Sequence, residues 1–314
     1  MVRNTLAVTC GDKLADYHFG DDHAFGPKRQ QAFIDGLVEK GLKDRVDWLS
    51  PVRCDDQCLQ NFHNADYIEQ VRRASEIGEG YLDHGDTPAR KGIFEAASTV
   101  VGSVTDMLDR IMSGEYRRGF IPVAGLHHGH RDHCNGFSVF NDCAIAIEYL
   151  RRRYGLRKIL YVDIDAHHGD GVMYNYDSDS ELYLVDVHED GRYLYPHTGD
   201  ADETGSGPAK GTKMNIPLPK HADDALFAEH WQQAKAFLQN ISPEFVVFQC
   251  GADSMQGDPM AHLSLTENSY RLVVDTLGEV ADKACDGRMI ALGGGGYRLD
   301  NIRKAWATVV EGML

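Results

Sequence analysis

Short apolar runs alternate along the chain with longer segments in which apolar residues recur every three or four positions. Short runs bounded by Gly, Pro or Asp predict buried strands, and the longer amphipathic segments predict helices. Strands are predicted at residues 6–10, 46–52, 120–124, 159–165, 182–187, 245–250 and 289–292. Helices are predicted from Pro27 to about Gly41, over 55–77, 93–112 and 140–154, after Gly169, and in a closing segment that reaches Leu314. Residues 188–212, rich in Gly, Pro and Asp, are expected to form a long loop.

Strands that alternate with helices throughout the chain predict an α/β fold with a parallel sheet. No domain linker or internal repeat interrupts the pattern, so residues 1–314 are expected to form a single domain. Open parallel sheets bind their ligands at the carboxyl ends of the strands. The functional site is therefore expected where polar clusters follow the predicted strands.

The most polar of these clusters follows the strand at 159–165, where the sequence from Tyr161 reads YVDIDAHHGDG. Side chains alternate between the two faces of a strand, so Asp163, Asp165 and His167 are expected to point to one side. Two carboxylates on one face repel each other unless a cation offsets their charge. A bound metal ion is the simplest explanation for this pattern.

Asp253, which follows the strand at 245–250, is the third predicted metal ligand beside Asp165 and His167. Three ligands and one open position suit a metal ion that activates water and polarises a carbonyl group. Two carboxylates and one imidazole accommodate Zn²⁺, Fe²⁺ or Co²⁺ equally well, so the ligands do not select the metal. A helix cap or a turn is the alternative role for Asp253.

Two adjacent histidines, His127 and His128, follow the strand at 120–124. Each needs its own hydrogen-bond acceptor, and Asp163 and Asp170 are the available carboxylates. An Asp–His pair fixes the tautomer of the imidazole and raises its basicity, as a general base requires. The alternative is that one of the two is a packed core histidine.

A run of four glycines precedes Tyr297 after the last predicted strand. Because glycine permits positive φ and close backbone approach, the run could aim the phenol into a cleft as an oxyanion donor. A buried tyrosine after a tight turn is the alternative, and the run lacks the GxGxxG spacing of a dinucleotide site. Phe137 and Tyr195, in loops near the predicted site, either wall an apolar channel or anchor their loops.

Composition and charge restrict the partners. The formal net charge of −16 argues against a nucleic-acid backbone and favours cationic ligands. No apolar run approaches the roughly 18 residues that span a membrane, and the first residues lack the apolar region of a signal peptide. The seven cysteines form no CxxC pair, although Cys54 and Cys58 could share one helical face. A reducing cytoplasm is the expected location.

Five segments carry a resemblance to a known family: GLHHGHRDHCNGFSVFND, YVDIDAHHGDGV, YPHTGD, GADSMQGDP and LGGGGY. In these segments, and in their order, the sequence resembles the metal-dependent histone deacetylase family. Its members include bacterial acetoin-utilisation proteins, acetylpolyamine amidohydrolases and protein deacylases. The resemblance implies an arginase-like open α/β fold, with an eight-stranded parallel sheet and helices on both faces, and the hydrolysis of linear amides.

The resemblance also implies a role for each candidate residue. It places zinc on Asp165, His167 and Asp253, and makes His128 the general base. His127 becomes an electrostatic partner or proton donor, and Tyr297 holds the oxyanion. Asp163 and Asp170 support the two histidines. The residues implied to line the acyl-lysine tunnel or its rim are Asp86, Gly136, Phe137, Tyr195, Met260 and Gly295. A structural potassium ion is implied near Asp163, Asp165, His167, Asp186 and Val187.

Four positions depart from the pattern of the family. Gly129 stands where Ala usually follows the two histidines. Tyr195 replaces the more common Phe and adds a hydroxyl group, and Asp186 adds a negative charge where a Ser is usual. Met260 occupies a rim position where polyamine deacetylases can carry a Glu. The expected substrates are therefore acylated lysines in proteins or peptides. Small acetylated amines are the alternative, and a non-catalytic acyl-lysine binding module is the third hypothesis. The sequence leaves the acyl-chain preference, the native metal and the oligomeric state open.

Overall fold

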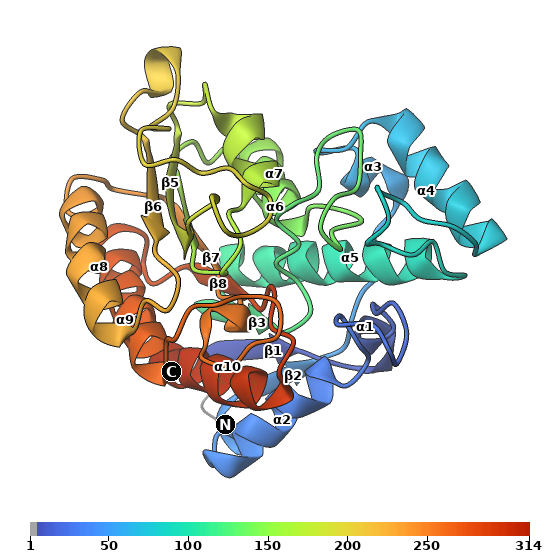
Figure 1. Ribbon diagram of the computed structural model, residues 1–314, viewed down its shortest axis with the longest axis horizontal. Coiled ribbons are helices and arrows are strands. Elements are labelled where there is room, and N and C mark those ends of the chain that lie inside the picture. The colour runs from blue at the N-terminus through green and yellow to red at the C-terminus, as the bar shows by residue number, and fades with distance from the viewer. Residues whose placement is uncertain (1–4) are drawn as a thin grey trace.

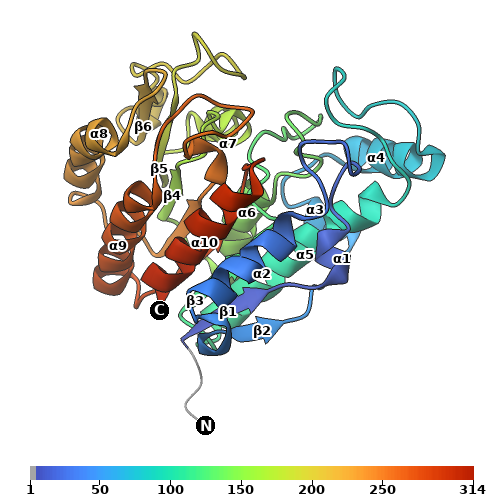
Figure 2. The same ribbon diagram turned by 60° about the horizontal axis from the view of Figure 1, so that its bottom comes forward.

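The computed structural model describes residues 5–314 and is built on one eight-stranded sheet, with helices on both faces (Figures 1 and 2). All neighbouring strands are parallel. The strands are β1 (Leu6–Thr9), β2 (Asp47–Leu49), β3 (Arg118–Ile121), β4 (Ile159–Asp163), β5 (Leu182–Glu189), β6 (Lys213–Leu218), β7 (Phe245–Gln249) and β8 (Met289–Leu292). Their order across the sheet is β2-β1-β3-β8-β7-β4-β5-β6. The predicted α/β class and the eight-stranded parallel sheet are confirmed.

The helices largely follow the apolar periodicity of the sequence. They are α1 (Asp12–Ala15), α2 (Arg29–Glu39), α3 (Asp56–Leu59), α4 (Ala65–Ile77), α5 (Ile93–Met112), α6 (Asp142–Tyr154), α7 (Asp170–Met173), α8 (Asp224–Leu238), α9 (Glu267–Ala284) and α10 (Leu299–Met313). The helix predicted at 93–112 has the predicted bounds. The segment 55–77 instead contains two helices, because the chain leaves α3 at Gln60 and begins α4 only after Asn64.

Four elements, α1, β6, α8 and α9, were not predicted from the sequence. Strand β6 lies at the edge of the sheet, and its sequence KMNIPL contains no long apolar run. Its Lys213 is buried, and the ammonium group donates hydrogen bonds to the backbone carbonyls of Asp179 and Leu182. Backbone acceptors thus make a charged residue compatible with a buried strand position. The pattern of apolar residues in the sequence gives no sign of such a position.

The two faces of the sheet carry separate apolar layers, because alternate residues of each strand point to opposite sides. Tyr161 and Val247 belong to the layer covered by α5 and α6. Val162 and Phe248, their neighbours in the chain, belong to the layer covered by α2, α8, α9 and α10. Since both faces are buried, the strand ends are left as the places where polar side chains can gather.

Helices α2 and α10 pack closely side by side (Figure 2). A Cβ atom at Gly36 of α2 would lie only 2.1 Å from the carbonyl oxygen of Arg303 in α10, so the contact requires a residue without a side chain.

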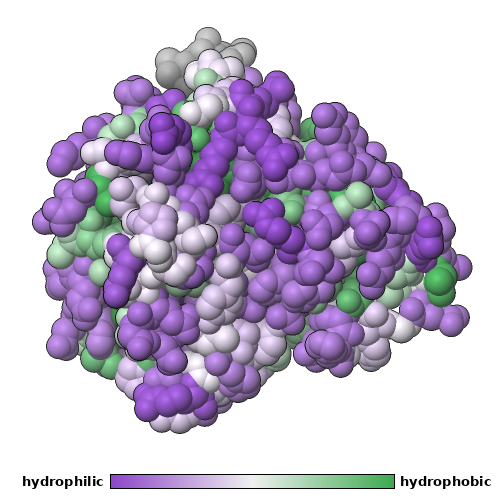
Figure 3. All heavy atoms as spheres, turned by 90° about the horizontal axis from the view of Figure 1, so that it is seen from above, coloured by the Kyte–Doolittle hydropathy of each residue, from purple (hydrophilic) through white to green (hydrophobic). Residues whose placement is uncertain are grey.

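The outer surface is mainly hydrophilic on the face shown in Figure 3. Across residues 5–314, every helix is too short or too polar to cross a bilayer.

Candidate active site

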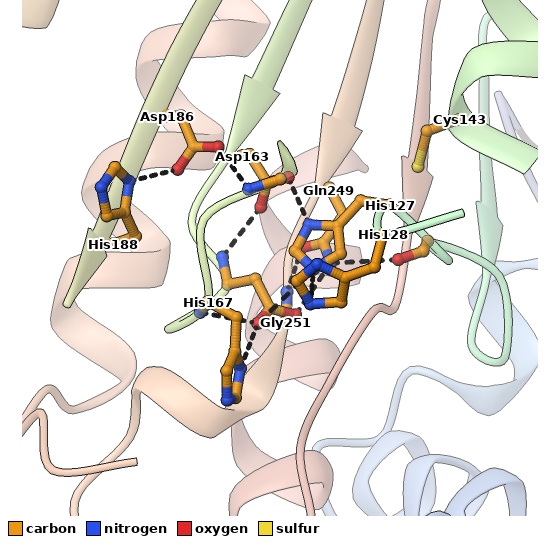
Figure 4. A network of polar contacts seen from close by, with 12 residues as sticks. His127, His128, Cys143, Asp163, His167, Asp186, His188, Gln249 and Gly251 are labelled. Atoms are coloured by element: carbon orange, nitrogen blue, oxygen red, sulfur yellow. Dashed lines mark hydrogen bonds and ion pairs between the residues drawn. The ribbon is translucent and has the colours of Figure 1, made fainter. Parts of the chain in front are cut away.

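Four neighbouring strands, β3, β8, β7 and β4, end at the same polar region in the middle of the sheet. Figure 4 shows side chains from these strand ends turned toward one another, among them His127, His167 and Gln249. The loops after the strands bring together residues that lie more than 100 positions apart in the sequence, such as Gly125 and Gln249. The polar clusters therefore converge at the carboxyl edge of the sheet, as predicted.

Asp165, His167 and Asp253 form a possible metal site at this edge. One donor atom from each lies within 4.8 Å of the others, and all three residues are buried. Nδ1 of His167 lies 3.1 Å from Oδ1 of Asp165 and 3.2 Å from Oδ2 of Asp253. Two carboxylates and one imidazole are donors that fit a divalent cation such as zinc.

The loop that carries two of these residues is shaped by its own carboxylates. Strand β4 ends at Asp163, so the prediction that it continues to Asp165 is wrong. The backbone amide of Asp165 donates to Oδ1 of Asp163, and the amide of His167 donates to Oδ1 of Asp165, each at 3.0 Å. These bonds replace the strand ladder and still direct both side chains toward the site.

Two neighbours fix the carboxylate of Asp165 from the other side. Nε2 of Gln249 and the backbone amide of Gly295 each donate to its Oδ2 atom at 2.8 Å. Gln249 was missed by sequence reasoning, because a glutamine at the end of an apolar strand carries no signal of its own. The Oδ1 atom of Asp253 accepts a hydrogen bond from the amide of Ala166 at 2.9 Å, so the second carboxylate of the possible metal site is also oriented.

The electrostatics of the three side chains favour positive charge between them. Burial and the nearby charge of Asp165 raise the pKa of Asp253 to about 7. Burial lowers the pKa of His167, but hydrogen bonds to Asp165 and Asp253 outweigh it and raise that pKa to about 10. A divalent cation supplies the same compensation to the two carboxylates.

The two adjacent histidines are paired with the two aspartates expected for them. Nδ1 of His127 lies 2.7 Å from Oδ2 of Asp163, and Nδ1 of His128 lies 2.6 Å from Oδ1 of Asp170. Their Nε2 atoms face each other at 3.0 Å. Because each Nδ1 donates to a carboxylate, one Nε2 must also carry a hydrogen to make this contact. The pair thus holds one proton more than two neutral imidazoles.

The surroundings assign this proton to His127. Burial lowers its pKa, but the carboxylates of Asp163 and Asp165 outweigh burial and raise it to about 10. Burial and the charge of His127 lower the pKa of His128 to about 4, although Asp170 acts in the opposite direction. His128 is therefore neutral at pH 7, with Nε2 able to accept a proton.

Other residues hold the histidine loop in place and were not identified from the sequence. The Asp142 carboxylate accepts hydrogen bonds from the amides of Gly125 and Leu126. The Asn141 side chain donates to the carbonyls of His127 and Gly129. Asn141 is also the N-cap of α6, which is the one sequence signal that singles it out.

Tyr297 is presented by the glycine run as expected. Gly294 and Gly296 have φ values of 72° and 121°, which residues with side chains rarely adopt. Burial and the nearby charges of Asp253 and Asp165 raise the pKa of the Tyr297 phenol well above its ordinary value. The phenol therefore keeps its hydrogen and can donate it to an oxyanion.

Arg29 of α2 holds the glycine run from behind. Its buried guanidinium donates to the carbonyl of Gly296 at 2.9 Å and also to the carbonyl of Gly294. It stacks on the Phe25 ring, with 3.8 Å between Cζ and the ring centroid. Sequence reasoning missed Arg29, because it lies more than 260 residues from the backbone that it contacts.

A narrow cavity of about 150 Å³ leads to these groups. His128, His167 and Tyr297 lie on its lining together with five of the six predicted substrate residues, namely Asp86, Gly136, Phe137, Tyr195 and Met260. The sixth, Gly295, lies in a smaller cavity beside it, and its amide hydrogen-bonds Asp165. Gly295 thus contacts a predicted metal ligand and not the tunnel wall.

Residues 23–313 match the histone deacetylase domain. The chain belongs to the histone deacetylase family. It is 37% identical over 302 residues to the acetoin utilization protein AcuC of Bacillus subtilis (strain 168), across 93% of this chain and 78% of that protein. It is 31% identical over 317 residues to AcuC of Staphylococcus xylosus, across 98% and 82%. The crystal structure of the HDA15 HD domain has a TM-score of 0.88 at 26% identity, covering 99% of this chain and 88% of that one.

The family resemblance seen in the sequence is thereby confirmed. Histone deacetylase family proteins are hydrolases that act on acetylated substrates and generally depend on a metal ion, which agrees with the Asp/His/Asp site.

The rim of the cavity in this histone deacetylase family member is organised by Asp83. Its carboxylate accepts hydrogen bonds from the amides of Gly85, Asp86 and Thr87. Asp83 therefore caps the turn that contains Asp86, and Asp86 is exposed at the rim. Thr87 in turn accepts a hydrogen bond from the amide of Phe137 at 3.1 Å, which couples the rim to the tunnel wall.

Two aromatic residues wall the cavity. Phe137 has a φ of 64°, unusual for a residue with a side chain, and the Tyr17 hydroxyl fixes it by donating to its carbonyl at 2.6 Å. The Tyr195 ring lies 5.3 Å from that of His128, between centroids. Its hydroxyl is buried and has no hydrogen-bond partner among residues 5–314, so the ring and not the hydroxyl faces the cavity.

Asp186, which the sequence resemblance places near an expected potassium ion, has a buried partner of its own. Its Oδ1 atom lies 2.7 Å from Nδ1 of His188, and its Oδ2 atom accepts a hydrogen bond from the amide of Gly169 at 2.8 Å (Figure 4). Burial lowers the pKa of His188, but Asp186 outweighs it and raises that pKa. Nε2 of His188 lies 3.0 Å from the carbonyl oxygen of Gly199, so both ring nitrogens face acceptors and His188 can match the added negative charge.

Proposed function

We propose that this protein is a zinc-dependent amidohydrolase that removes acetyl or other short acyl groups from lysine side chains of proteins or peptides. One observation carries the proposal: a neutral histidine, a possible metal site and a protonated tyrosine meet on the lining of one narrow cavity. A hydrolytic site needs a base, an electrophile and an oxyanion donor within reach of one carbonyl carbon.

The residues of the chain divide the reaction between them. A zinc ion held by Asp165, His167 and Asp253 would polarise the amide carbonyl and lower the pKa of a water molecule. His128, held by Asp170, accepts the proton of the attacking water at Nε2. The phenol of Tyr297 donates to the developing oxyanion.

The leaving amine then takes a proton from the histidine pair. The extra proton resides on His127, whose Nε2 atom is 3.0 Å from that of His128. Asp163 keeps His127 protonated, so His127 acts as electrostatic partner and proton reserve.

The cavity and its rim support an acylated lysine as the substrate. Apolar walls made by Phe137 and Tyr195 suit the methylene stem of an acylated lysine. The exposed Asp86 can accept hydrogen bonds from substrate backbone amides, and Met260, 38% exposed, adds no charge beside it. A small acetylated amine is the second candidate, because the formal net charge of −16 attracts cations of any kind.

Acetate release from the zinc-loaded protein tests both substrates side by side, on acetyl-lysine peptides and on N-acetylated polyamines. We expect faster release from the peptides. Faster release from the polyamines would replace the lysine substrate by the small amine. No release from either, with zinc bound, would contradict the hydrolase and favour an acyl-lysine binding module.

Features outside the reaction stay predictions. The structural potassium ion is one, and comparing the unfolding temperature in potassium and sodium salts would test it. A single-domain organisation, a cytoplasmic location and the absence of nucleic-acid and membrane partners are the others, and they rest on sequence pattern, charge and cysteine usage.

A further inference from the structure

A second cavity, of about 700 Å³, lies away from the candidate active site, where α3, α5 and α6 meet. Cys54 and Cys58 are both on its lining, and the mechanism uses neither of them. Both are free and half-buried, so a reagent in the cavity can reach them. The pair noted in the sequence thus shares one accessible site.

The two thiols are next to each other. Cys54 directly precedes the N-cap of α3, and Cys58 lies in the first turn of that helix. Asp55, the N-cap residue, accepts a hydrogen bond from the amide of Cys58 at 2.9 Å and so folds the segment back on itself. This turn brings Cys54 and Cys58 onto the lining of the same cavity.

Helix α5 forms a rigid support beneath the pair. The amide of Cys54 donates to the carbonyl of Ser98 at 3.1 Å, and Sγ of Cys58 lies 3.8 Å from Oγ1 of Thr105. A Cβ atom at Gly102 would lie 2.4 Å from the amide nitrogen of Cys54, so only glycine permits this close approach. The thiols are therefore held together by the fold and need no rearrangement to meet.

The surroundings make the two thiols unequal. Polar contact with the side chains of Cys54, Thr105 and Asn61 lowers the pKa of the Cys58 thiol against the opposing effect of burial. The same contact and burial raise the pKa of Cys54. Cys58 is thus the nucleophile and Cys54 the resolving thiol.

The other cysteines are poor competitors. Burial raises the pKa of Cys10, Cys134, Cys143, Cys250 and Cys285. Arg152 and Arg153 of α6 also line the cavity, where their positive charges, although each has a carboxylate partner, favour an anionic reagent.

We propose that Cys54 and Cys58 form a thiol–disulfide exchange site that reacts with anionic low-molecular-weight disulfides of the glutathione type. The Cys58 thiolate attacks one sulfur of the disulfide, which forms a mixed disulfide and releases the first small thiol with the proton that Cys58 has lost. Cys54 then attacks the sulfur of Cys58, forms the Cys54–Cys58 disulfide and releases the second small thiol with its own proton. Two protein thiols are oxidised, and one small disulfide is reduced to two thiols.

The test uses the full-length, zinc-loaded protein and oxidised glutathione, with intact-mass and peptide-mapping mass spectrometry. We expect the protein to lose two hydrogen atoms, with the new bond mapped between Cys54 and Cys58. In Cys54→Ser the mixed disulfide should persist on Cys58. In Cys58→Ser the reaction at Cys54 should be at least about tenfold slower, because the thiolate is lost. Cys10→Ser is the matched control and should react like the parent protein.

The experiment on the parent protein, without any variant, can already refute the proposal. It fails if oxidation of the folded parent protein leaves Cys54 and Cys58 as free thiols, or if it modifies Cys10 at an equal rate. Failure of Cys54→Ser to accumulate glutathione on Cys58 would refute the assigned roles. Because the readout is mass and not acetate release, the outcome is independent of the proposed hydrolase activity.

Discussion

At the scale of single residues, one proton between His127 and His128 sets the expected pH dependence. His128 must be neutral to accept a proton, so kcat/KM should fall as the pH drops through its pKa of about 4. His127 must be protonated, so kcat/KM should also fall as the pH rises through its pKa of about 10. A bell-shaped profile of kcat/KM against pH, measured on an acetyl-lysine peptide, is the expected result.

The variant Asp163→Asn tests whether the titration of His127 causes the alkaline limb of that profile. Removing the carboxylate charge beside His127 lowers the pKa of the imidazole, so the alkaline limb should move to lower pH. Asp170→Asn is the matched variant, because it removes the corresponding charge from His128 and should leave the alkaline limb in place. An alkaline limb that stays unchanged in Asp163→Asn would contradict the assignment of the extra proton to His127.

The phenol of Tyr297 is expected to act on the rate and not on the fold. Tyr297→Phe should bind zinc normally, shown by elemental analysis, and lose roughly 10²–10³-fold in kcat, as the removal of one oxyanion donor does. Tyr183→Phe, in β5 and outside the cavity lining, is the matched control and should keep its turnover. Near-normal turnover in Tyr297→Phe would refute the oxyanion role.

At the scale of elements, two helical glycines should respond in opposite ways to the same substitution. Gly36→Ala places a Cβ atom against the backbone of α10, and overpacking of this kind costs roughly 1–3 kcal/mol. At Gly278 of α9 the nearest atom to a Cβ is 3.6 Å away, on the Arg118 side chain. Gly278→Ala should therefore gain about 0.5–1 kcal/mol from helix propensity. Denaturant unfolding of both variants measures the difference, and equal effects would contradict the close contact of α2 with α10.

Most elements with strong apolar periodicity were predicted, although α9, whose buried residues recur every three or four positions, was overlooked. Helix α5 was found with its bounds, because its apolar face is continuous. Strand β6 was missed, because the burial of Lys213 depends on carbonyl acceptors in another segment.

The same distinction applies to the site. Asp165, His167 and Asp253 each follow a strand and could be proposed from the sequence. Arg29 and Gln249 support the site through contacts that join distant segments, and no local pattern marks such contacts.

At the scale of the whole molecule, metal binding should be linked to stability. The three donor side chains converge only in the folded chain, so zinc binds the native state and raises the free energy of unfolding. At a free zinc concentration of about 100 times Kd this contribution is roughly 2.7 kcal/mol, which raises Tm by about 4 °C for a chain of this length. Removing the metal with a chelator should lower Tm, and adding zinc back should restore it.

Asp253→Ala provides the control for that shift in Tm. The variant lacks one ligand, so its Tm should no longer respond to zinc or to the chelator. A full zinc-dependent shift in Asp253→Ala would contradict the ligand assignment.

The order of the strands has a consequence for synthesis on the ribosome. Strands β8 and β7 lie between β3 and β4, although the chain makes them last. Until residues 245–292 emerge, β2-β1-β3 and β4-β5-β6 are two separate small sheets, each with an unpaired edge where the centre of the enzyme will be. Unpaired edges attract other chains. We therefore expect a nascent chain released before β7 to be an aggregation-prone fragment, with His127 and His128 on one sheet and Asp165 and His167 on the other.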